Sequence, residues 1–283
     1  LDAEGGVMFT TPAIDLLATV ARLGMGSGHD RWRSRARGLP ETAGELPVAV
    51  LAEEIETRGP GQIRALVTIA GNPALSTPNG PRLERAMETL DFMVSVDSYL
   101  NETTRHAHVI LPPVSPLSRS HYDLALNAFS VRNTAKYVPP VFPRGEDERH
   151  DWEILAHLSA RLFFPRVARR AALAALLVGP DALLEAGFRV GPYGIGRSRS
   201  ARAGGPLSLA RLRRAPHGLD LGPLEPCLPG ALFTRSKRIQ AAPPMFKRQL
   251  ADLAGEVDRA RAGIASPDLV LVGRREMRTN NSW

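Results

Sequence analysis

Residues 63–113 have the sequence IRALVTIAGNPALSTPNGPRLERAMETLDFMVSVDSYLNETTRHAHVILPP, and this stretch decides the fold class. It contains three short apolar runs of the length that strands have: Ile63–Ala70, Phe92–Val96 and Val109–Leu111. Helical patterns over Pro81–Leu90 and Glu102–Ala107 separate these runs. Apolar runs that alternate with helical segments are typical of parallel strands covered by helices. The stretch therefore predicts an α/β fold with an open, mostly parallel sheet and helices on both faces.

Further helical patterns flank the predicted sheet: Thr11–Leu23, Pro47–Thr57 and His150–Phe163. Between the first two, residues 24–45 are rich in Gly, Arg and Pro, which predicts a loop. We expect one α/β domain over residues 1–165, followed by an irregular, Arg-rich helical extension over residues 166–267. Residues 268–283 contain another short apolar run, Leu269–Val272, which predicts one more strand followed by a loop.

The composition is that of a globular protein, with 43% hydrophobic and 23% charged residues among 283. No run of about 18 apolar residues occurs, so we expect no membrane-spanning helix. Cys227 is the single cysteine, which excludes an internal disulfide framework and a cysteine-ligated iron–sulfur or zinc site made by this chain alone. The chain starts at Leu1 without a secretory signal, so we interpret it as part of a longer or processed protein. We expect a cytoplasmic location, and a targeting signal ahead of Leu1 stays open.

Polar residues follow each predicted strand at its carboxyl end, where open parallel sheets bind their ligands. The successive strand ends carry Gly71-Asn72-Pro73 with Ser76, then Asp97 with Glu102-Thr103, then Pro112-Pro113 with Arg119. Asp97 could accept two hydrogen bonds from an N–H/NH₂ pair such as guanine offers, and Asn72 can both donate and accept. Gly71 allows a ligand to approach the backbone closely, and Arg119 could neutralise a phosphate. These residues indicate a nucleotide site, with the alternative that they form only turns and a helix cap.

Other motifs bear on the remaining function classes. Neither the dinucleotide fingerprint G-x-G-x-x-G at a helix start nor the phosphate-binding G-x-x-x-x-G-K-[ST] occurs, which argues against ordinary NAD and ATP sites. His106, His108 and His121 could form a metal site, but no carboxylate or cysteine at ligand spacing supports it. The stretch Arg161–Arg214 contains eleven arginines and two acidic residues. A stand-alone α/β module that binds a nucleotide or nucleic acid through this stretch is therefore an alternative function.

Three stretches carry a resemblance to a known family: VTIAGNPALSTPNGPRLERAM at 67–87, LDFMVSVDSYLNETTRHAHVILPP at 90–113 and RHDWEILAHLSARL at 149–162. Their order and spacing resemble the third domain of the molybdopterin oxidoreductase superfamily, which includes formate dehydrogenases, molybdenum nitrate reductases and dimethyl-sulfoxide reductase. The matching elements are a Gly-x-Asn-Pro-like loop, a Val-x-x-Asp…Glu-Thr element, an Ala-Asp-Val-Ile-Leu-Pro element and an Asp-Trp helix. Residues 267–283 resemble the first strand and loop of the family's fourth, β-barrel domain.

The resemblance implies a Rossmann-like domain and a bis-(molybdopterin guanine dinucleotide) cofactor that holds molybdenum or tungsten. In the family this domain binds one of the two guanine dinucleotides, and a loop of the fourth domain also contacts the cofactor. Carried over position by position, the cofactor-binding residues are Gly71, Asn72, Pro73, Ser76, Asp97, Arg119, Asp151, Arg274, Asn281 and Ser282. The resemblance implies no catalytic residue and no metal ligand in this chain.

The chain also departs from the family pattern. The Asp of the Ala-Asp-Val-Ile-Leu-Pro element is His108 here, and HYDLALNAFSVRN at 121–133 replaces a substrate-side Gly-Thr…Asn…Glu-Gly-Arg element. The family's cysteine-rich [4Fe–4S] segment and its metal-ligating residue have no counterpart in this sequence. We therefore expect a fragment of a formate dehydrogenase-like or nitrate reductase-like oxidoreductase that is not catalytically complete alone. Its expected partners are the remaining domains of the same enzyme, a small-molecule substrate and an electron-transfer subunit, and not nucleic acid.

Overall fold

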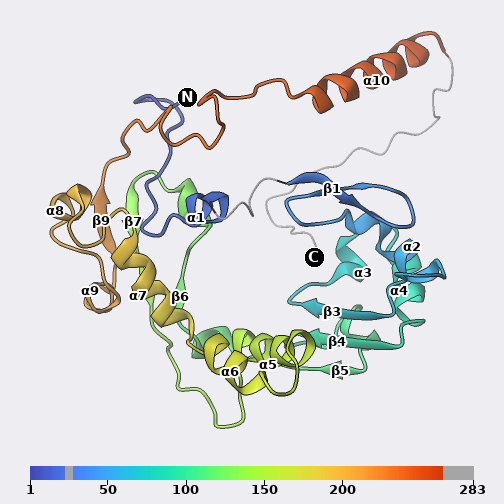
Figure 1. Cartoon of the computed structure of the whole chain (residues 1–283), viewed down its shortest axis with the longest axis horizontal. Helices are drawn as coiled ribbons and strands as arrows, with labels where there is room; N and C mark the ends of the chain where they lie inside the picture. The colour runs from blue at the N-terminus through green and yellow to red at the C-terminus, as the bar shows by residue number, and fades with distance from the viewer. Residues whose placement is uncertain (23–27, 264–283) are drawn as a thin grey trace. The chain divides into compact units, whose positions relative to one another are not determined.

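A computed structural model describes residues 1–22 and 28–263 of the chain (Figure 1). Contacts between residues divide the chain into two compact units, Leu1–Pro226 and Cys227–Trp283. The first unit contains the predicted sheet and the seven candidate residues that lie in the described part of the chain. The second unit contains the helix α10 (Pro244–Arg261). The strand and the β-barrel start predicted for residues 268–283 lie outside the described residues.

The predicted parallel sheet is present in the first unit. Its strands are β3 (Ala65–Ile69), β4 (Phe92–Val96) and β5 (Val109–Ile110), hydrogen-bonded in the order β3-β4-β5. Both pairings are parallel, with Ala65 opposite Phe92 and Val94 opposite Val109. This confirms the α/β fold with a parallel sheet. The carboxyl ends of β3 and β4 lie side by side, because Ile69 is opposite Val96.

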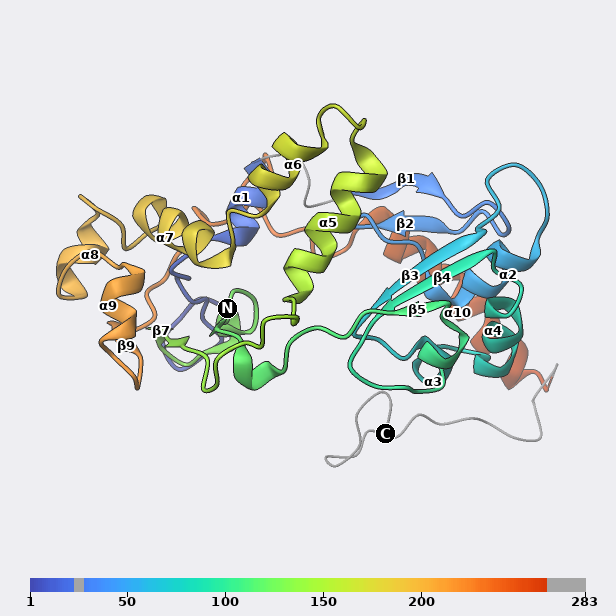
Figure 2. The same cartoon turned by 90° about the horizontal axis from the view of Figure 1, so that it is seen from below.

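Helices cover one face of this sheet. They are α2 (Leu51–Glu56), which continues the 3₁₀ turn η1 (Val48–Val50), and α4 (Gly80–Met87), which begins shortly after α3 (Pro73–Ser76). Figure 2 shows α2 and α4 on the same side of the three strands. Their apolar residues form one core with the sheet: Ala52, Ile55, Ala74, Leu83, Ala86, Met87, Leu90 and Met93. Burying these side chains stabilises the fold and holds the sheet on the α2–α4 layer.

The opposite face of the sheet is apolar and partly exposed, because Val94 and Val96 of β4 are buried on it. Val67 is 45% exposed, Ile69 50% and Phe92 48%, and the register places them on one face. Helices on this second face, as the Rossmann-like prediction requires, therefore stay a prediction. The predicted helix over Glu102–Ala107 is a single 3₁₀ turn, η2 (Thr104–His106).

An antiparallel hairpin occurs where composition predicts a loop. Its strands are β1 (His29–Arg33) and β2 (Pro40–Thr42), and every residue of β1 is exposed. The fully buried Glu41 accepts hydrogen bonds from the Arg31 guanidinium, at 2.6 Å, and from the Gly44 N–H. The loop prediction for this stretch was wrong. The two strands are held together by the ion pair of Arg31 and Glu41, and they lack the alternating apolar side chains by which a strand is recognised in a sequence.

A second core of the first unit joins residues from both sides of position 165. Here β6 (His121–Tyr122) pairs with β8 (Tyr137–Val138), and β7 (Asn133–Ala135) pairs with β9 (Leu219–Gly222). Two further 3₁₀ turns lie in this part, η3 (Pro116–Ser118) and η4 (Leu126–Phe129). Its buried residues are Ala13, Ala135, Tyr137, Leu184, Phe188, Tyr193, Ala203, Leu207, Leu209, Leu212 and Leu221. The predicted domain boundary at residue 165 stays a prediction, and contacts of this core cross it.

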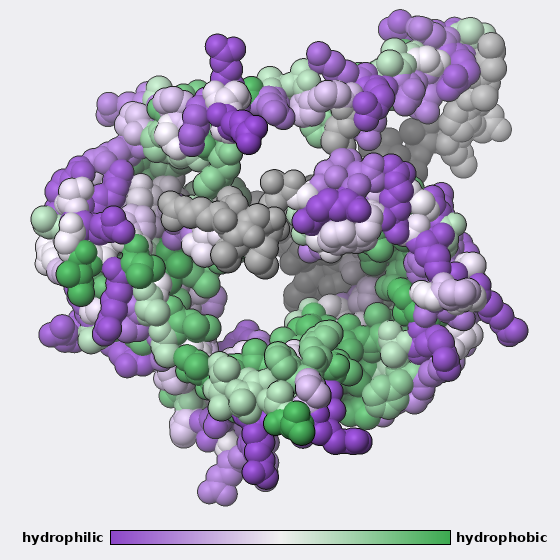
Figure 3. Space-filling view, viewed as in Figure 1, coloured by the Kyte–Doolittle hydropathy of each residue, from purple (hydrophilic) through white to green (hydrophobic). Residues whose placement is uncertain are grey.

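The remaining helices of the first unit are α1 (Leu16–Arg22), α5 (Asp151–Phe163), α6 (Arg169–Leu176), α7 (Pro180–Val190), α8 (Ser198–Arg202) and α9 (Leu209–Arg213). Figure 3 shows apolar residues gathered over α5 and α6, where Leu162 and Leu176 are exposed. None of the described helices is by itself long and apolar enough to cross a membrane; α6 and α7 satisfy that criterion only when joined across their 62° bend.

Candidate functional site

The first part of the site is the turn at the carboxyl end of β3. Ala70 has φ of 48°, and its N–H donates to Val96 O at 3.0 Å. A left-handed backbone at a residue other than glycine is uncommon and is often found at functional sites. The turn places Asn72 at the start of α3, with Pro73 as the first helical residue.

Hydrogen bonds hold the Asn72 side chain against the loop after β4. Its Oδ1 accepts from the Thr103 hydroxyl at 2.7 Å, and its Nδ2 donates to Glu102 Oε2 at 2.8 Å. The Thr103 Oγ1 also accepts from the Ala74 N–H at 3.0 Å, and Thr103 is fully buried. The hydrogen bond from Asn72 holds the pKa of the Glu102 carboxyl below its usual value. The ends of β3 and β4 are therefore joined by side chains and not only by the sheet.

Asp97 lies at the carboxyl end of β4 and is partly buried. Its Oδ1 accepts from the Tyr99 N–H at 3.1 Å, and its Oδ2 accepts from Asn101 Nδ2 at 3.4 Å. A carboxylate has about four acceptor positions, so each oxygen retains capacity for a further donor. Asp97 can therefore keep its loop in place and still accept hydrogen bonds from a ligand.

The smaller residues predicted for the site lie around Asn72. A Cβ on Gly71 would come no closer than 3.7 Å to Ile69 O, an ordinary contact, and the φ of Gly71 is not left-handed. The packing of the chain therefore does not require glycine here, and space beside the backbone is open. The exposed Ser76 donates its hydroxyl to Asn72 O at 3.0 Å.

A second group of predicted residues lies at the start of α5. Arg119 Nη1 and Asp151 Oδ2 form an ion pair at 3.0 Å, with about two fifths of each side chain exposed. Asp151 is the first residue of α5, where a carboxylate is stabilised by the positive end of the helix dipole. The His150 N–H donates to Glu153 Oε2 at 2.8 Å and completes the start of the helix. The Val114 N–H donates to Arg149 O, which ties this helix start to the segment after β5.

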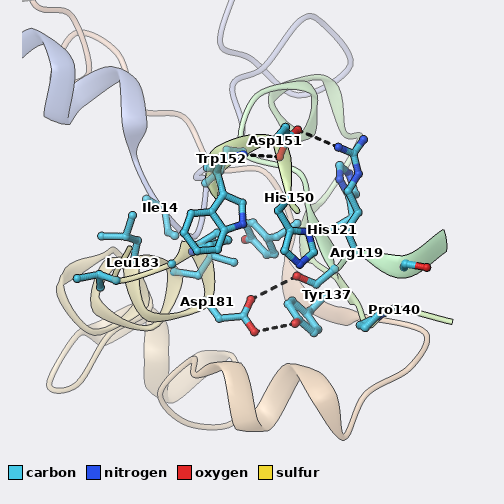
Figure 4. Close-up of a pocket in the computed structure, with 18 of the residues that line it drawn as sticks. Ile14, Arg119, His121, Tyr137, Pro140, His150, Asp151, Trp152, Asp181 and Leu183 are labelled. Atoms are coloured by element: carbon cyan, nitrogen blue, oxygen red, sulfur yellow. Dashed lines mark hydrogen bonds and ion pairs between the residues drawn. The ribbon is translucent and has the colours of Figure 1, made fainter. Parts of the chain in front are cut away.

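Arg119 and Asp151 line a cavity of about 980 Å³ (Figure 4). Figure 4 shows these two residues on one side and Asp181 beside Tyr137 on another. Asp181 Oδ2 accepts from the Tyr137 hydroxyl at 2.9 Å and from Arg213 at 2.7 Å. Further residues of the wall are Ile14, His121, Tyr122, His150, Trp152, Leu177, Val178 and Leu184. The cavity thus combines apolar and aromatic walls with charged groups, as binding pockets for small molecules do.

The structure brings the candidates together in two groups. Gly71, Asn72, Pro73, Ser76 and Asp97 share the carboxyl edge of the sheet, while Arg119 and Asp151 share the cavity. Among the described residues, no hydrogen bond or ion pair joins the two groups. Arg274, Asn281 and Ser282 lie outside the described residues.

Sequence reasoning did not single out Asp181, Tyr137 and Arg213 as part of a site. They come from different elements, and no local motif marks them. Glu102 and Thr103 could be identified as candidates from the sequence because they follow β4. Their hydrogen bonds with Asn72 could not be predicted from it. In the described part of the chain, no three or more His, Cys, Asp or Glu side chains form a group that could hold a metal ion. The metal site considered for His106, His108 and His121 therefore has no support there.

Comparison with known proteins adds independent information. A sequence model described as "Molybdopterin oxidoreductase" matches residues 15–161. The chain is 32% identical over 111 residues to the assimilatory nitrate reductase catalytic subunit of Bacillus subtilis (strain 168), which covers 39% of this chain and 15% of that protein. It is 30% identical over 188 residues to the NADPH-Fe(3+) oxidoreductase subunit alpha of Geobacter sulfurreducens (strain DL-1 / KN400), covering 65% of this chain and 21% of that protein.

A third relative is the nitrate reductase of Synechocystis sp. (strain ATCC 27184 / PCC 6803 / Kazusa), 32% identical over 108 residues, which are 36% of this chain and 14% of that protein. The chain thus spans about a fifth or less of the length of these curated relatives. The family match covers more than half of the chain and includes β3, β4 and β5, the start of α5 and the candidate residues from Gly71 to Asp151. On this evidence the chain belongs to the molybdopterin oxidoreductase family.

Proposed function

We propose that this chain holds part of the guanine dinucleotide of a molybdopterin cofactor, in an oxidoreductase of the formate dehydrogenase or nitrate reductase kind. The family implies a molybdopterin cofactor with molybdenum. The observation that carries the proposal is the pair of side chains at the ends of β3 and β4. Asn72 and Asp97 follow neighbouring parallel strands, at the edge where open sheets bind ligands.

The chemistry of these residues fits a guanine nucleotide. A carboxylate that retains free acceptor positions suits the N–H and NH₂ donors of guanine, and Asp97 retains them. The open space beside Gly71 suits a ligand that approaches the backbone, and Arg119 carries the charge that a phosphate requires. When bound, the cofactor supplies the redox-active metal centre. The share of this chain is to bind and orient the nucleotide part of the cofactor and to exclude water around it.

The remaining partners belong to the same proposal. A [4Fe–4S] cluster, the ligand of molybdenum or tungsten and a β-barrel domain would come from other parts of the same polypeptide. Helices of that polypeptide would also cover the exposed part of the second face, at Val67, Ile69 and Phe92, which completes a Rossmann-like layer arrangement. A small-molecule substrate and an electron-transfer subunit would meet the enzyme outside this chain.

Metal and nucleotide analysis of the full-length polypeptide tests the proposal. Purified from its own host, it should contain molybdenum or tungsten in near-stoichiometric amount and release GMP on acid hydrolysis. Asp97→Asn removes one charged acceptor, and bonds to charged groups contribute about 1.5–3 kcal/mol. We expect at least tenfold less GMP per polypeptide after equal dialysis. The matched control, Asp252→Asn on the exposed face of α10, should retain it. Full GMP retention by Asp97→Asn, or a metal-free protein from a host that loads other such enzymes, would reject the proposal.

The fragment status has its own test. The 283-residue chain produced alone should show no metal-dependent redox turnover, because the metal ligand would be supplied elsewhere in the polypeptide. Activity is followed with a reduced viologen dye and nitrate, and with formate and an oxidised dye. Turnover that depends on molybdenum or tungsten would show that the chain is catalytically complete.

A further inference from the structure

We propose that Glu102 and Thr103 are positioning residues that hold the amide of Asn72 in one orientation toward a guanine nucleotide. This inference rests on the proposed function, because the nucleotide is the ligand that Asn72 would contact. It adds to that function two residues that act through Asn72.

Thr103 fixes the oxygen side of the amide. The Ala74 N–H donates to Thr103 Oγ1 at 3.0 Å, so the hydroxyl accepts on that side. The hydroxyl proton is then directed at Asn72 Oδ1, 2.7 Å away. The backbone N–H of Ala74 can only donate, so the hydroxyl proton stays free to donate to Asn72; with the amide turned over, this buried proton would lose the Asn72 oxygen as its acceptor. The atom of Asn72 that faces Thr103 is therefore the oxygen.

Glu102 fixes the nitrogen side. An ionised carboxylate only accepts hydrogen bonds, and Glu102 Oε2 lies 2.8 Å from Asn72 Nδ2. The hydrogen bond from Asn72 lowers the pKa of Glu102, so the carboxylate form is favoured. Turning the amide over would place its oxygen against this carboxylate and its NH₂ group against the hydroxyl of Thr103. The contact between the amide oxygen and the carboxylate is repulsive, and the Thr103 hydroxyl proton loses the Asn72 oxygen as its acceptor, so one orientation is selected.

The loop that carries these two residues is itself held in place. Asn101 Oδ1 accepts from the N–H groups of Thr103 and Thr104, at 3.0 and 2.9 Å. The same Asn101 donates through Nδ2 to Asp97 at 3.4 Å. The loop therefore links the two proposed nucleotide-binding residues, Asp97 and Asn72. The amide of Asn72 retains one N–H and one lone pair for a ligand, both in a defined direction.

A mutant cycle on GDP binding tests the inference. The full-length polypeptide is produced without cofactor synthesis and titrated with GDP, and urea unfolding is measured in parallel. We expect Asn72→Ala and Glu102→Ala each to weaken GDP binding by about tenfold. In the Asn72→Ala background, Glu102→Ala should change the GDP affinity by less than about twofold, because its effect passes through Asn72.

Conservative variants separate positioning from loss of fold. Glu102→Gln keeps a side-chain oxygen that can accept from Asn72, so GDP affinity should stay within about threefold of the unsubstituted protein. Thr103→Ser keeps the hydroxyl and should behave likewise. Thr103→Val keeps the shape and removes the hydroxyl, so it should weaken GDP binding as Glu102→Ala does. If Thr103→Val does not fold, the Glu102 variants decide the result.

Each other outcome is informative. An equal effect of Glu102→Ala with and without Asn72 would mean that Glu102 acts on its own, and the inference fails. Weak binding by Asn72→Ala with normal binding by Glu102→Ala and Thr103→Val would also reject it and leave the proposed function intact. GDP binding that Asn72→Ala does not alter would reject the inference as well. A polypeptide that binds no GDP and carries no guanine nucleotide would overturn both the inference and the proposed function.

Discussion

The Glu41 carboxylate shows how one residue can hold a whole turn of this protein. It belongs to β2 of the β1–β2 hairpin and is buried, and the Arg31 guanidinium and the Gly44 N–H both donate to it. The hydrogen bond from Arg31, assisted by that from Gly44 and opposed by burial, lowers the pKa of Glu41 to about 2. A second carboxylate, Glu54 of α2, accepts from the Ala36 N–H at 2.7 Å and joins the hairpin to the sheet layer.

The lowered pKa predicts a pH dependence of stability. A carboxyl whose pKa is lower in the folded than in the unfolded state stabilises the fold above the unfolded value, near 4.5. This contribution is lost as the pH falls from there toward 2. We expect Glu41→Gln to be less stable than the unsubstituted protein at pH 7 and to lose less stability between pH 5 and pH 2.5. Urea unfolding at several pH values measures both. Parallel pH curves for the two proteins would contradict the role assigned to Glu41.

At the scale of elements, the α3–α4 connection packs two backbone segments closely together. It brings Gly80, the first residue of α4, against Ala74, the second residue of α3. A Cβ on Gly80 would lie 2.0 Å from Ala74 O, a backbone atom. The same Ala74 donates its N–H to Thr103, so the connection also supports the strand-edge site. Close packing of two backbones is therefore coupled to the position of Asn72.

We expect Gly80→Ala to destabilise the protein by about 1–3 kcal/mol, because the backbone must move to admit the methyl group. A matched control is Gly145→Ala in an exposed loop, where a Cβ would contact Glu148 Cγ at 3.4 Å and the φ is not left-handed. That variant should change the free energy of unfolding by less than about 0.5 kcal/mol. Chemical denaturation of the three proteins makes the comparison. Equal stability of Gly80→Ala and the control would show that the α3–α4 connection adapts freely.

At the scale of the whole first unit, two cores support two different parts. The core under the sheet holds the strand edge, while the second core supports the cavity that Arg119 and Asp151 line. Phe188 of α7 is fully buried in the second core and meets Tyr122 edge to face at 5.2 Å. Burial of Tyr122 raises the pKa of its hydroxyl, in agreement with an apolar interior. Residues before and after position 165 thus share one interior.

Phe188→Ala should destabilise the first unit by about 3–5 kcal/mol, the range for removing a buried aromatic side chain. Because the core crosses residue 165, hydrogen exchange should speed up in β6 and β8 as well as in α7. The exposed Phe163 on α5 provides the control, and Phe163→Ala should leave both measurements nearly unchanged. Faster exchange confined to residues after 165 would instead support two separately folding parts.

Local patterns predicted the sheet and its edge. The runs at 63–70, 92–96 and 109–111 became β3, β4 and β5, because short continuous apolar runs between helical segments are typical of parallel strands. The positions of Asn72 and Asp97 followed from the strand ends, and the structure places both at one edge. The hairpin at Glu41 could not be predicted, because an ion pair between residues ten apart leaves no periodic pattern. The contacts of Asp181 in α7 could not be predicted from the sequence either, because its partners Tyr137 and Arg213 lie 44 and 32 residues away.

The sequence by itself therefore determined the fold class, the family and the residues at the carboxyl edge of the sheet. These features depend on the order of apolar and polar side chains within short segments, which can be read directly from the sequence. Only the tertiary structure decided the orientation of the Asn72 amide, the partners of Asp181 and the core that crosses residue 165. These depend on hydrogen bonds and contacts between distant segments, whose geometry exists only after the chain has folded.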